Sequence, residues 1–446
     1  MKDNLTVGLI TLGCAKNQVD SEYMLSDLEK AGFALTEDLS DAVAIVINTC
    51  AFIQPAKEES IETILEAARY KETGRCRVLA VVGCMAARYR DALRTEMPEV
   101  DIFLGVGDEE HRLGDILARK LGLKPTAAPG IFMPRQVRTI SEGWAYLKIS
   151  EGCDNRCSYC AIPRIRGNLA SRPVEALVEE ARFLESLGIV ELNLIAQDTT
   201  AYGTECSEKG APRLVNLLEL LLDSTSIPWF RLLYTHPAHL EESLLEFMAV
   251  NHRIVPYLDM PIQHASDRIL AMMGRKVTRS EIQRKIELAR AILGDPILRT
   301  TVLVGFPGET ERDFEELLDF IQEMRFHRLG GFIYSREEGT AAYDFRGSVS
   351  RAEKERRLEM ILEIQRSISA ELNSKCVGKV LPVLVERTLD PSETQLPEFR
   401  LVGRSRAHAP EVDGAVYLAG ERLAAGTITE VLIRESSDYD LFGTAA

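Results

Sequence analysis

Short apolar runs alternate with polar stretches over the first quarter of the chain. The runs Val7–Leu12, Val43–Ile47 and Val78–Val82 are rich in β-branched residues, and polar stretches with Glu and Lys, such as Ser21–Lys30, lie between them. Continuous apolar runs of this length are typical of strands buried on both faces of a parallel sheet. Their alternation with helical patterns predicts an open, doubly wound α/β sheet.

A second alternation of the same kind begins near Arg138. Helical patterns separate six further candidate strands, which are Ala145–Ser150, Val190–Ala196, Phe230–Tyr234, Val255–Met260, Leu298–Val304 and Gly331–Ser335. Six consecutive βα units predict a partial, TIM-like (βα)6 barrel. The active site of such a barrel lies at the carboxyl ends of its strands.

The last part of the chain changes character again. Ser350–Ser374 predicts a charged helix, whose Arg and Glu residues indicate a solvated face. After Gly378 the pattern turns to strands at Val380–Val385, Ala415–Leu418 and Thr427–Ile433, which predicts a small antiparallel β-barrel.

These changes of pattern predict a multidomain chain. The predicted segments are an N-terminal domain (1–124), a linker containing Pro125, Pro129 and Gly130 (125–137), the partial barrel (138–375) and the C-terminal barrel (376–446).

Composition limits the classes of partner. The formal net charge is -15, which disfavours an extended phosphate-binding surface and therefore DNA as a partner. The sequence shows neither a signal peptide nor an apolar stretch long enough to span a membrane. We therefore expect a cytoplasmic protein with no membrane partner, whose nine cysteines are reduced and available as ligands.

The clearest chemical signal is the compact group Cys153, Cys157 and Cys160, which follows the first strand of the predicted partial barrel. Thiolates at this spacing suit either an iron–sulfur cluster or zinc. Zinc would need a fourth ligand from elsewhere in the chain, such as His236 or His264. The absence of a second CxxC or HxxxH partner favours the cluster.

Three further cysteines follow the three N-terminal strands. Cys14, Cys50 and Cys84 each come just after a strand, and glycines precede the first and the last of them directly. Ligands gather at the carboxyl ends of parallel strands, so these thiols are expected to converge on a second metal site. The alternative is three inert thiols in the core, which is how Cys76, Cys206 and Cys376 are interpreted.

Polar and glycine residues follow the other strands of the partial barrel. Gln197 and Gly305 are candidates to contact a cofactor, since glycine lets backbone approach a ligand closely, although ordinary loops and turns also use both residue types.

The three cysteines have the spacing CxxxCxxC, and the aromatic residue Tyr159 stands directly before the last of them. This pattern resembles the motif of the radical S-adenosylmethionine enzymes. The resemblance implies a 4Fe–4S cluster held by Cys153, Cys157 and Cys160, whose open iron binds S-adenosylmethionine. Tyr159 could then lie beside the adenine.

The chain also has three single cysteines before this motif and a β-module at its C-terminal end. With these features together, the whole chain resembles the methylthiotransferases. This resemblance implies that Cys14, Cys50 and Cys84 hold an auxiliary 4Fe–4S cluster and that the C-terminal barrel is a TRAM domain. No side chain is assigned as a catalytic acid or base.

Within that family, three strings resemble the RimO branch, and they are Ala196–Gly203, Tyr334–Thr340 and Ser437–Gly443. The resemblance implies methylthiolation of the β-carbon of an aspartate in a small-subunit ribosomal protein. A 5′-deoxyadenosyl radical would abstract hydrogen, and the auxiliary cluster would deliver sulfur. The expected partners are that basic protein, on the ribosome, and an electron donor such as flavodoxin or ferredoxin, whereas the sulfur donor is not indicated.

The charge of the C-terminal module agrees with a basic partner. Residues 376–446 hold seven basic and eleven acidic residues, for a net charge of -4, and Glu411, Asp413, Glu435 and Asp438 are expected to be exposed.

Two alternatives remain open at this point. One is a MiaB-like tRNA adenosine methylthiotransferase, and the other is a non-catalytic, metal-bearing protein that docks on the ribosome.

Overall fold

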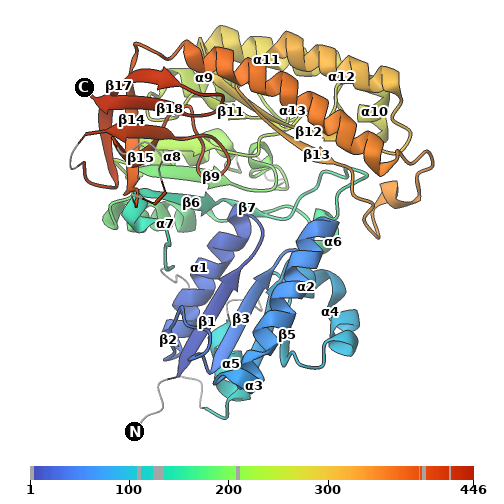
Figure 1. The fold of residues 1–446 in the computed structure, drawn as a ribbon, viewed down its shortest axis with the longest axis vertical. Coiled ribbons are helices and arrows are strands. Elements are labelled where there is room, and N and C mark those ends of the chain that lie inside the picture. The colour runs from blue at the N-terminus through green and yellow to red at the C-terminus, as the bar shows by residue number, and fades with distance from the viewer. Residues whose placement is uncertain are drawn as a thin grey trace.

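The computed structural model describes residues 5–107, 112–123, 135–206, 211–390, 392–393, 398–420 and 423–446. Figure 1 shows an N-terminal α/β domain below a curved array of strands and helices, with a small β-barrel packed beside that array. Within the described residues, no helix combines the length and the apolar character that a membrane span requires.

The N-terminal domain is an open parallel sheet with the strand order β2-β1-β3-β4-β5, which confirms the predicted class. Every residue of β3 and β4 is buried, as their continuous apolar runs predict. The strands are β1 (Thr6–Thr11), β2 (Ala34–Leu35), β3 (Ala44–Thr49), β4 (Val78–Gly83) and β5 (Ile102–Leu104).

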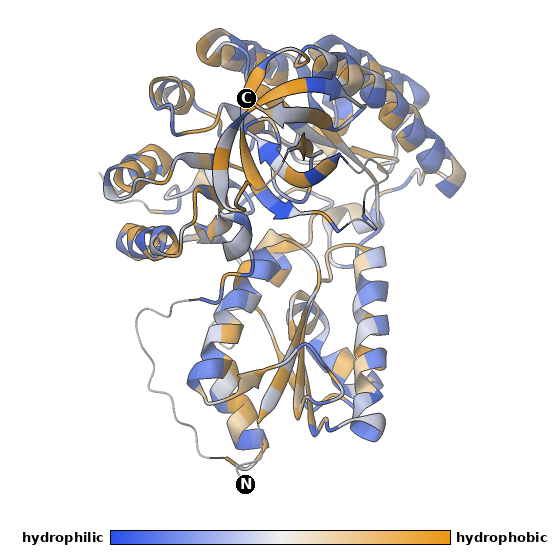
Figure 2. Cartoon of the chain, turned by 60° about the vertical axis from the view of Figure 1, so that its left-hand side comes forward, coloured by the Kyte–Doolittle hydropathy of each residue, from blue (hydrophilic) through white to orange (hydrophobic). Residues whose placement is uncertain are grey.

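Helices cover both faces of this sheet. The helices α1 and α5 pack on one apolar layer and α2 and α4 on the other, because successive strand residues point to opposite faces. Figure 2 shows the apolar strands enclosed by helices whose outer sides are hydrophilic. The helices are α1 (Ala15–Lys30), α2 (Gln54–Ala68), α3 (Tyr70–Thr73), α4 (Cys84–Glu96) and α5 (Leu113–Lys120).

The middle domain contains the six predicted strands as two parallel sheets, β10-β9-β6 and β11-β12-β13. A bridge between Phe230 and Ile254 lies where the sheets meet, so they form one partial barrel. The strands are β6 (Trp144–Lys148), β9 (Glu191–Ile195), β10 (Trp229–Leu232), β11 (Tyr257–Asp259), β12 (Ile297–Val304) and β13 (Arg328–Ile333), and a short hairpin adds β7 (Ser150–Glu151) and β8 (Ala170–Ser171).

Helices line the outside of this partial barrel (Figure 1). Capping boxes begin two of them, at Thr278 with Glu281 and at Thr310 with Asp313. These helices are α7 (Val174–Ser186), α8 (Leu214–Ser224), α9 (Glu242–Val250), α10 (Asp267–Met272), α11 (Arg279–Leu293), α12 (Glu311–Met324) and α13 (Arg351–Ser374). The short helix α6 (Ile162–Ile165) instead packs against the N-terminal domain, where Ile165 joins a core cluster.

The helix α13 corrects one sequence interpretation. Arg357 is buried and pairs with Glu309 at 2.7 Å, and Ile361 and Ile368 belong to the core of the partial barrel. The charged run is therefore only partly solvated, because one of its arginines neutralises a buried carboxylate.

The C-terminal domain is a closed five-stranded barrel, as predicted, with the order β14-β15-β16-β18-β17. Its pairings are antiparallel except for β16 with β18, which is parallel. The strands are β14 (Val380–Thr388), β15 (Phe399–Ser405), β16 (Val416–Ala419), β17 (Thr427–Ser436) and β18 (Leu441–Ala445).

The C-terminal barrel joins the middle domain through buried charges. Glu191 of β9 accepts from Arg231 of β10 at 2.8 Å and from Arg404 of β15 at 2.6 Å, and all three side chains are buried. The expectation of exposure is wrong for Asp413 and correct for Glu411. The side chain of Asp413 is 1% exposed and accepts from the Tyr257 hydroxyl, whereas Glu411 is exposed but accepts from the Tyr146 hydroxyl.

Most of the predicted linker, residues 125–134, lies outside the described residues. The described end of that segment begins at Arg135, which is buried between the N-terminal and middle domains. The numerical domain boundaries stay a prediction.

Candidate active site

A cavity of about 330 Å³ lies between the N-terminal domain and the partial barrel. All six candidate ligands line it. They are Cys14, Cys50 and Cys84 from one domain and Cys153, Cys157 and Cys160 from the other. Two cysteine triplets from different domains therefore open onto the same space.

The first triplet comes from the loops that follow three neighbouring strands, β1, β3 and β4. Cys14 caps α1, Cys84 is the first residue of α4, and Cys50 lies shortly before α2. The first turns of these helices carry no acidic residue. The partial positive charge at a helix N-terminus thus favours thiolates or another anion at this end of the sheet.

Asn17 ties these loops together. Its amide nitrogen donates to the carbonyls of Leu12 at 2.8 Å and Thr49 at 3.1 Å, and the Cys84 thiol lies 3.7 Å from its amide oxygen. One buried side chain therefore fixes the relative positions of all three loops.

Glycine is required directly before two of these cysteines. Gly13 has φ +99°, and a Cβ there would lie 3.2 Å from the Cys50 sulfur. Gly83 has φ +86°, and its Cβ would lie 2.2 Å from the Asn48 side-chain oxygen. A larger residue at either position would displace a cysteine loop or its support.

The second triplet lies in a loop that hydrogen bonds hold at both ends. Gly152 has φ +68°, and a Cβ there would lie 2.0 Å from the carbonyl oxygen of Asn168. The backbone N–H of Ser158 donates to Met273 at 2.9 Å, and its carbonyl accepts from Ala342 at 2.7 Å. The compact spacing of the three cysteines is thus built into a fixed backbone.

The thiols are costly to ionise without a cation. Burial raises the pKa of Cys84 and of Cys160 to about 12, and it also raises the pKa of Cys50 and Cys153. Metal ligation deprotonates thiols of this kind outright. Two triplets of soft donors that line one shared cavity fit two iron–sulfur clusters with three protein ligands each.

The two histidines considered as zinc ligands are in different places. His264 is fully buried away from the cavity, where its Nδ1 accepts from the backbone of Ser266 at 3.0 Å. His236 lines the cavity, with its Nδ1 accepting from the backbone of Ala238 at 3.1 Å.

The candidate cofactor contacts are only partly brought together. Tyr159 and Gln197 line the cavity. Gly305 lies outside it, and the stem of Lys354 occupies the space beside its α-carbon, where a Cβ would be 2.3 Å from that side chain. The cysteines regarded as structural lie outside the cavity too, with Cys76 buried and Cys206 exposed.

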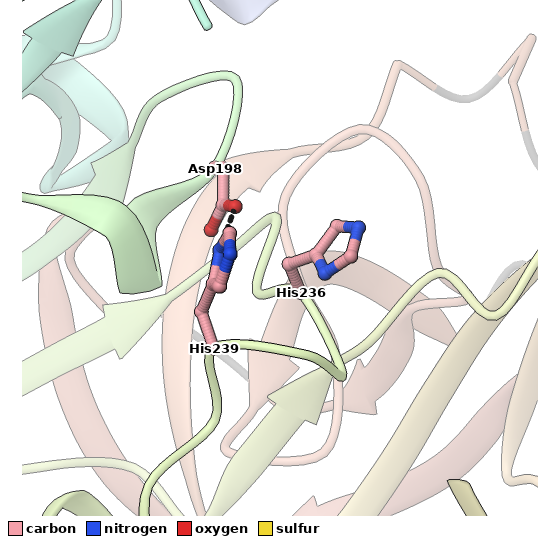
Figure 3. Close-up of side chains that lie close together, drawn as sticks. All are labelled: Asp198, His236 and His239. Carbon is pink, nitrogen blue, oxygen red and sulfur yellow. Dashed lines mark hydrogen bonds and ion pairs between the residues drawn. The ribbon is translucent and has the colours of Figure 1, made fainter. Parts of the chain in front are cut away.

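Asp198, His236 and His239 form a polar group beside the cavity (Figure 3). The carboxylate of Asp198 accepts from Asn155 at 2.8 Å and from Thr200 at 2.5 Å, and His239 Nδ1 lies 2.7 Å from it. Burial opposes the charge of Asp198, but the hydrogen bond from His239 keeps its pKa below the ordinary value.

This group does not resemble a metal site, although its ligand atoms lie within 4.8 Å of one another. The two imidazole rings stack with centroids 5.0 Å apart, so their in-plane lone pairs do not converge. Burial lowers the pKa of His236 to about 3, which keeps the ring neutral. Its Nε2–H is a buried donor without a partner among the described residues.

Several cavity residues were not predicted from the sequence, among them Lys16, Tyr234 and Arg275. Tyr234 and Gln263 have φ of +59° and +70°, a left-handed backbone that costs a non-glycine residue about 1–3 kcal/mol. Burial lowers the pKa of Lys16 to about 8. None of these properties has a local sequence signal, because each depends on contacts between residues far apart in the chain.

Buried ion pairs close the seam between the two domains. The Arg166 side chain is 1% exposed and donates to Glu151 at 2.8 Å, to Asn17 at 2.6 Å and to Asp20 at 3.0 Å. Lys148 pairs with Asp20 and with Glu151. The segments that carry both cysteine triplets are therefore joined through the guanidinium group of Arg166 and the ammonium group of Lys148.

Two more ion-pair groups lie along the same seam. Arg135 pairs with Glu22 at 2.6 Å and with Glu180 at 2.9 Å. Glu337, at the far side of the cavity, accepts from Lys57 at 2.8 Å and from Arg88 at 2.9 Å.

Three family models match successive parts of the chain. Residues 6–105 match "Uncharacterized protein family UPF0004", residues 147–321 match the Radical SAM superfamily, and residues 377–446 match the TRAM domain.

Curated relatives match nearly the whole length. A "Ribosomal protein uS12 methylthiotransferase RimO" of Acetivibrio thermocellus is 44% identical over 98% of this chain and 97% of its own. A protein of the same name from Heliobacterium modesticaldum is 44% identical over 99% of this chain and 95% of its own.

Solved structures support the fold alone, because their sequence identity is low. The radical S-adenosylmethionine methyltransferase TsrM from Kitasatospora setae superposes with a TM-score of 0.55 at 14% identity, over 85% of this chain and 80% of that one. OxsB, a cobalamin-dependent S-adenosylmethionine radical enzyme, gives a TM-score of 0.51 at 13% identity, over 81% of this chain and 56% of that one.

The seam gives the first prediction. Replacing Arg166 by Leu leaves Lys148 as the only ion-pair partner of Asp20 and Glu151 among the described residues, and removal of one partner from a buried ion-pair network costs about 3–5 kcal/mol. Amide hydrogen exchange should become faster in both cysteine loops, around residues 12–18 and 151–167. Arg75→Leu is the matched control, since Arg75 and Asp41 form an exposed pair in the N-terminal domain. Unchanged exchange in Arg166→Leu would show that Arg166 does not hold the two loops together.

Proposed function

The chain belongs to the RimO family of ribosomal protein uS12 methylthiotransferases, and we propose that it replaces one hydrogen on the β-carbon of an aspartate of that protein by a methylthio group. The observation that carries the proposal is the single cavity onto which two cysteine triplets open. Family membership argues against both a tRNA adenosine methylthiotransferase and a non-catalytic docking protein.

Each triplet is assigned one 4Fe–4S cluster. Cys153, Cys157 and Cys160 would hold the cluster that binds S-adenosylmethionine, and Cys14, Cys50 and Cys84 would hold the auxiliary cluster. When bound, these groups supply the radical that removes the hydrogen. They also supply the sulfur and the methyl group that take its place. Membership in a radical S-adenosylmethionine family favours this assignment over zinc.

The side chains of the cavity bind and shield rather than exchange protons. A β C–H bond beside a carboxylate is too weakly acidic for a protein base, which agrees with the absence of an assigned acid or base. Phe52, Ile162, Ile165 and Tyr159 give the cavity apolar walls that exclude water from a reactive site. The protein therefore contributes orientation and a dry environment, while the cofactors contribute the chemistry.

Surface charge supports a basic protein as the substrate. The chain carries a net charge of -15, and Glu430, Glu435 and Asp438 remain exposed on the C-terminal barrel. Complementary charge accelerates encounter with a basic partner and disfavours a phosphate backbone. Glu411 and Asp413 contribute less to this surface, because they bind tyrosine hydroxyls of the partial barrel.

An outside electron donor completes the proposal. Beyond the two triplets, the described residues hold no further group of three cysteines. A one-electron protein donor of the flavodoxin or ferredoxin type would therefore reduce the enzyme directly. Work on a ribosomal protein would place the reaction in the cytoplasm.

The second prediction separates the two triplets. In anaerobically reconstituted protein, replacing Cys153, Cys157 and Cys160 by Ala should remove about half of the iron and sulfide and abolish 5′-deoxyadenosine formation. Replacing Cys14, Cys50 and Cys84 by Ala should also remove about half of the iron, but 5′-deoxyadenosine should still form without methylthiolated product. Cys206→Ala is the control, because Cys206 is exposed and lies outside the cavity. Stoichiometric zinc, or methylthiolated product from the second variant, would contradict the assignment.

The third prediction concerns the substrate. Purified small ribosomal subunits and unmodified tRNA are offered together to the reconstituted enzyme, and mass spectrometry searches both for the methylthio increment. The increment should occur on an aspartate of uS12 and not on the tRNA. Product on a tRNA adenosine alone would assign the chain to the other branch of methylthiotransferases.

A further inference from the structure

Lys16 places a buried ammonium group inside the cavity. It is the second residue of α1, next but one to Cys14, and its residue exposure is 5%. Its Nζ lies 3.0 Å from the centroid of the Tyr234 ring. Both residues line the cavity that the two cysteine triplets share.

This ammonium has no carboxylate partner within ion-pair distance among the described residues. The other two cations of the cavity are engaged. Arg166 pairs with Asp20 and Glu151, and Arg275 donates to the carbonyl of Pro261 and lies 3.9 Å from the Cys157 sulfur. Arg275 therefore lies beside the second triplet, at Cys157. Lys16 lies near the first triplet and is the cation of the cavity lining that has no ion-pair partner among the described residues.

The backbone of Tyr234 supports this arrangement. Its φ of +59° is strained, and it persists because the Tyr234 N–H donates to Asp259 at 2.9 Å and its carbonyl accepts from Thr199 at 3.0 Å. This backbone presents the face of the Tyr234 ring to the Lys16 ammonium. A cation–π contact is worth about 0.5–2 kcal/mol, so it keeps the cation in place and leaves its N–H groups able to bind an anion.

The substrate brings such an anion. The carboxylate carbon of aspartate is bonded directly to the β-carbon that reacts, so both must enter the cavity together. The walls are largely apolar, and a carboxylate moved there from water requires a charged hydrogen-bonding partner.

We propose that Lys16 binds the side-chain carboxylate of the substrate aspartate and thereby holds its β-carbon between the two cysteine triplets. This inference rests on the proposed function and adds a specificity determinant to it. An ammonium in this place selects an acidic side chain over its amide and over an uncharged nucleobase. Lys16 is thus a substrate-binding residue and takes no part in bond making.

The test compares two substrates and two neutral variants. Lys16→Met and Lys16→Gln remove the charge with similar length, so one remains usable if the other folds poorly. Lys30→Met is the control, since Lys30 is exposed at the other end of α1. Each protein is assayed with two substrates, which are uS12 and a uS12 variant whose target aspartate is replaced by Asn. The measured quantities are Kd and KM for the substrate, the cluster content, and the 5′-deoxyadenosine formed without substrate.

The wild type should bind the aspartate form about ten- to hundredfold more tightly than the Asn form, as expected for a charged hydrogen bond. Both neutral variants should lose that preference, with KM for the aspartate form raised by a similar factor. Cluster content and uncoupled 5′-deoxyadenosine should stay at the wild-type level, and Lys30→Met should match the wild type throughout.

Two outcomes separate the inference from the function on which it rests. If the wild type methylthiolates uS12 and the neutral variants keep its preference for aspartate, Lys16 does not bind the carboxylate and the inference fails alone. If the wild type gives no methylthiolated uS12, the proposed function itself fails.

Discussion

The active site depends on a buried seam of ion pairs between two domains. Neither domain contains both cysteine triplets, so the shared cavity depends on the ion pairs that join the domains, in which Arg166 and Lys148 both connect Asp20 to Glu151. Charges buried in this way contribute little net stability when paired, but they are costly to separate. The seam therefore fixes the geometry of the site more than it stabilises the fold.

The two domains meet where parallel sheets commonly place their ligands. Both the doubly wound sheet and the partial barrel carry functional residues at the carboxyl ends of their strands. Here those two ends face each other across the cavity, which cysteines from both domains line. The C-terminal barrel attaches elsewhere on the partial barrel, through the ion pair of Glu191 and Arg404.

The sequence predicts most of the strands, the order of the domains and the position of the six cysteines after strands, because apolar periodicity and cysteine spacing are local properties, whereas the role of these cysteines as cluster ligands stays a prediction. It does not predict β15 and β18, since Gly403 and Gly443 interrupt their apolar pattern. A Cβ at these positions would lie 2.1 and 2.6 Å from the backbone of the neighbouring strand. The roles of Lys16, Tyr234 and Asp413 were also hidden, because each depends on a contact between domains. Gly305 shows the opposite error, as a plausible ligand-binding turn is filled by Lys354.

The central claim is that two clusters share one cavity, and the iron itself provides the most direct measurement. Crystals of anaerobically reconstituted protein should give two iron centres in anomalous diffraction at the iron absorption edge. One centre should lie against Cys14, Cys50 and Cys84 and the other against Cys153, Cys157 and Cys160, with the cavity between them. A single iron centre, or a second centre away from this cavity, would contradict the account.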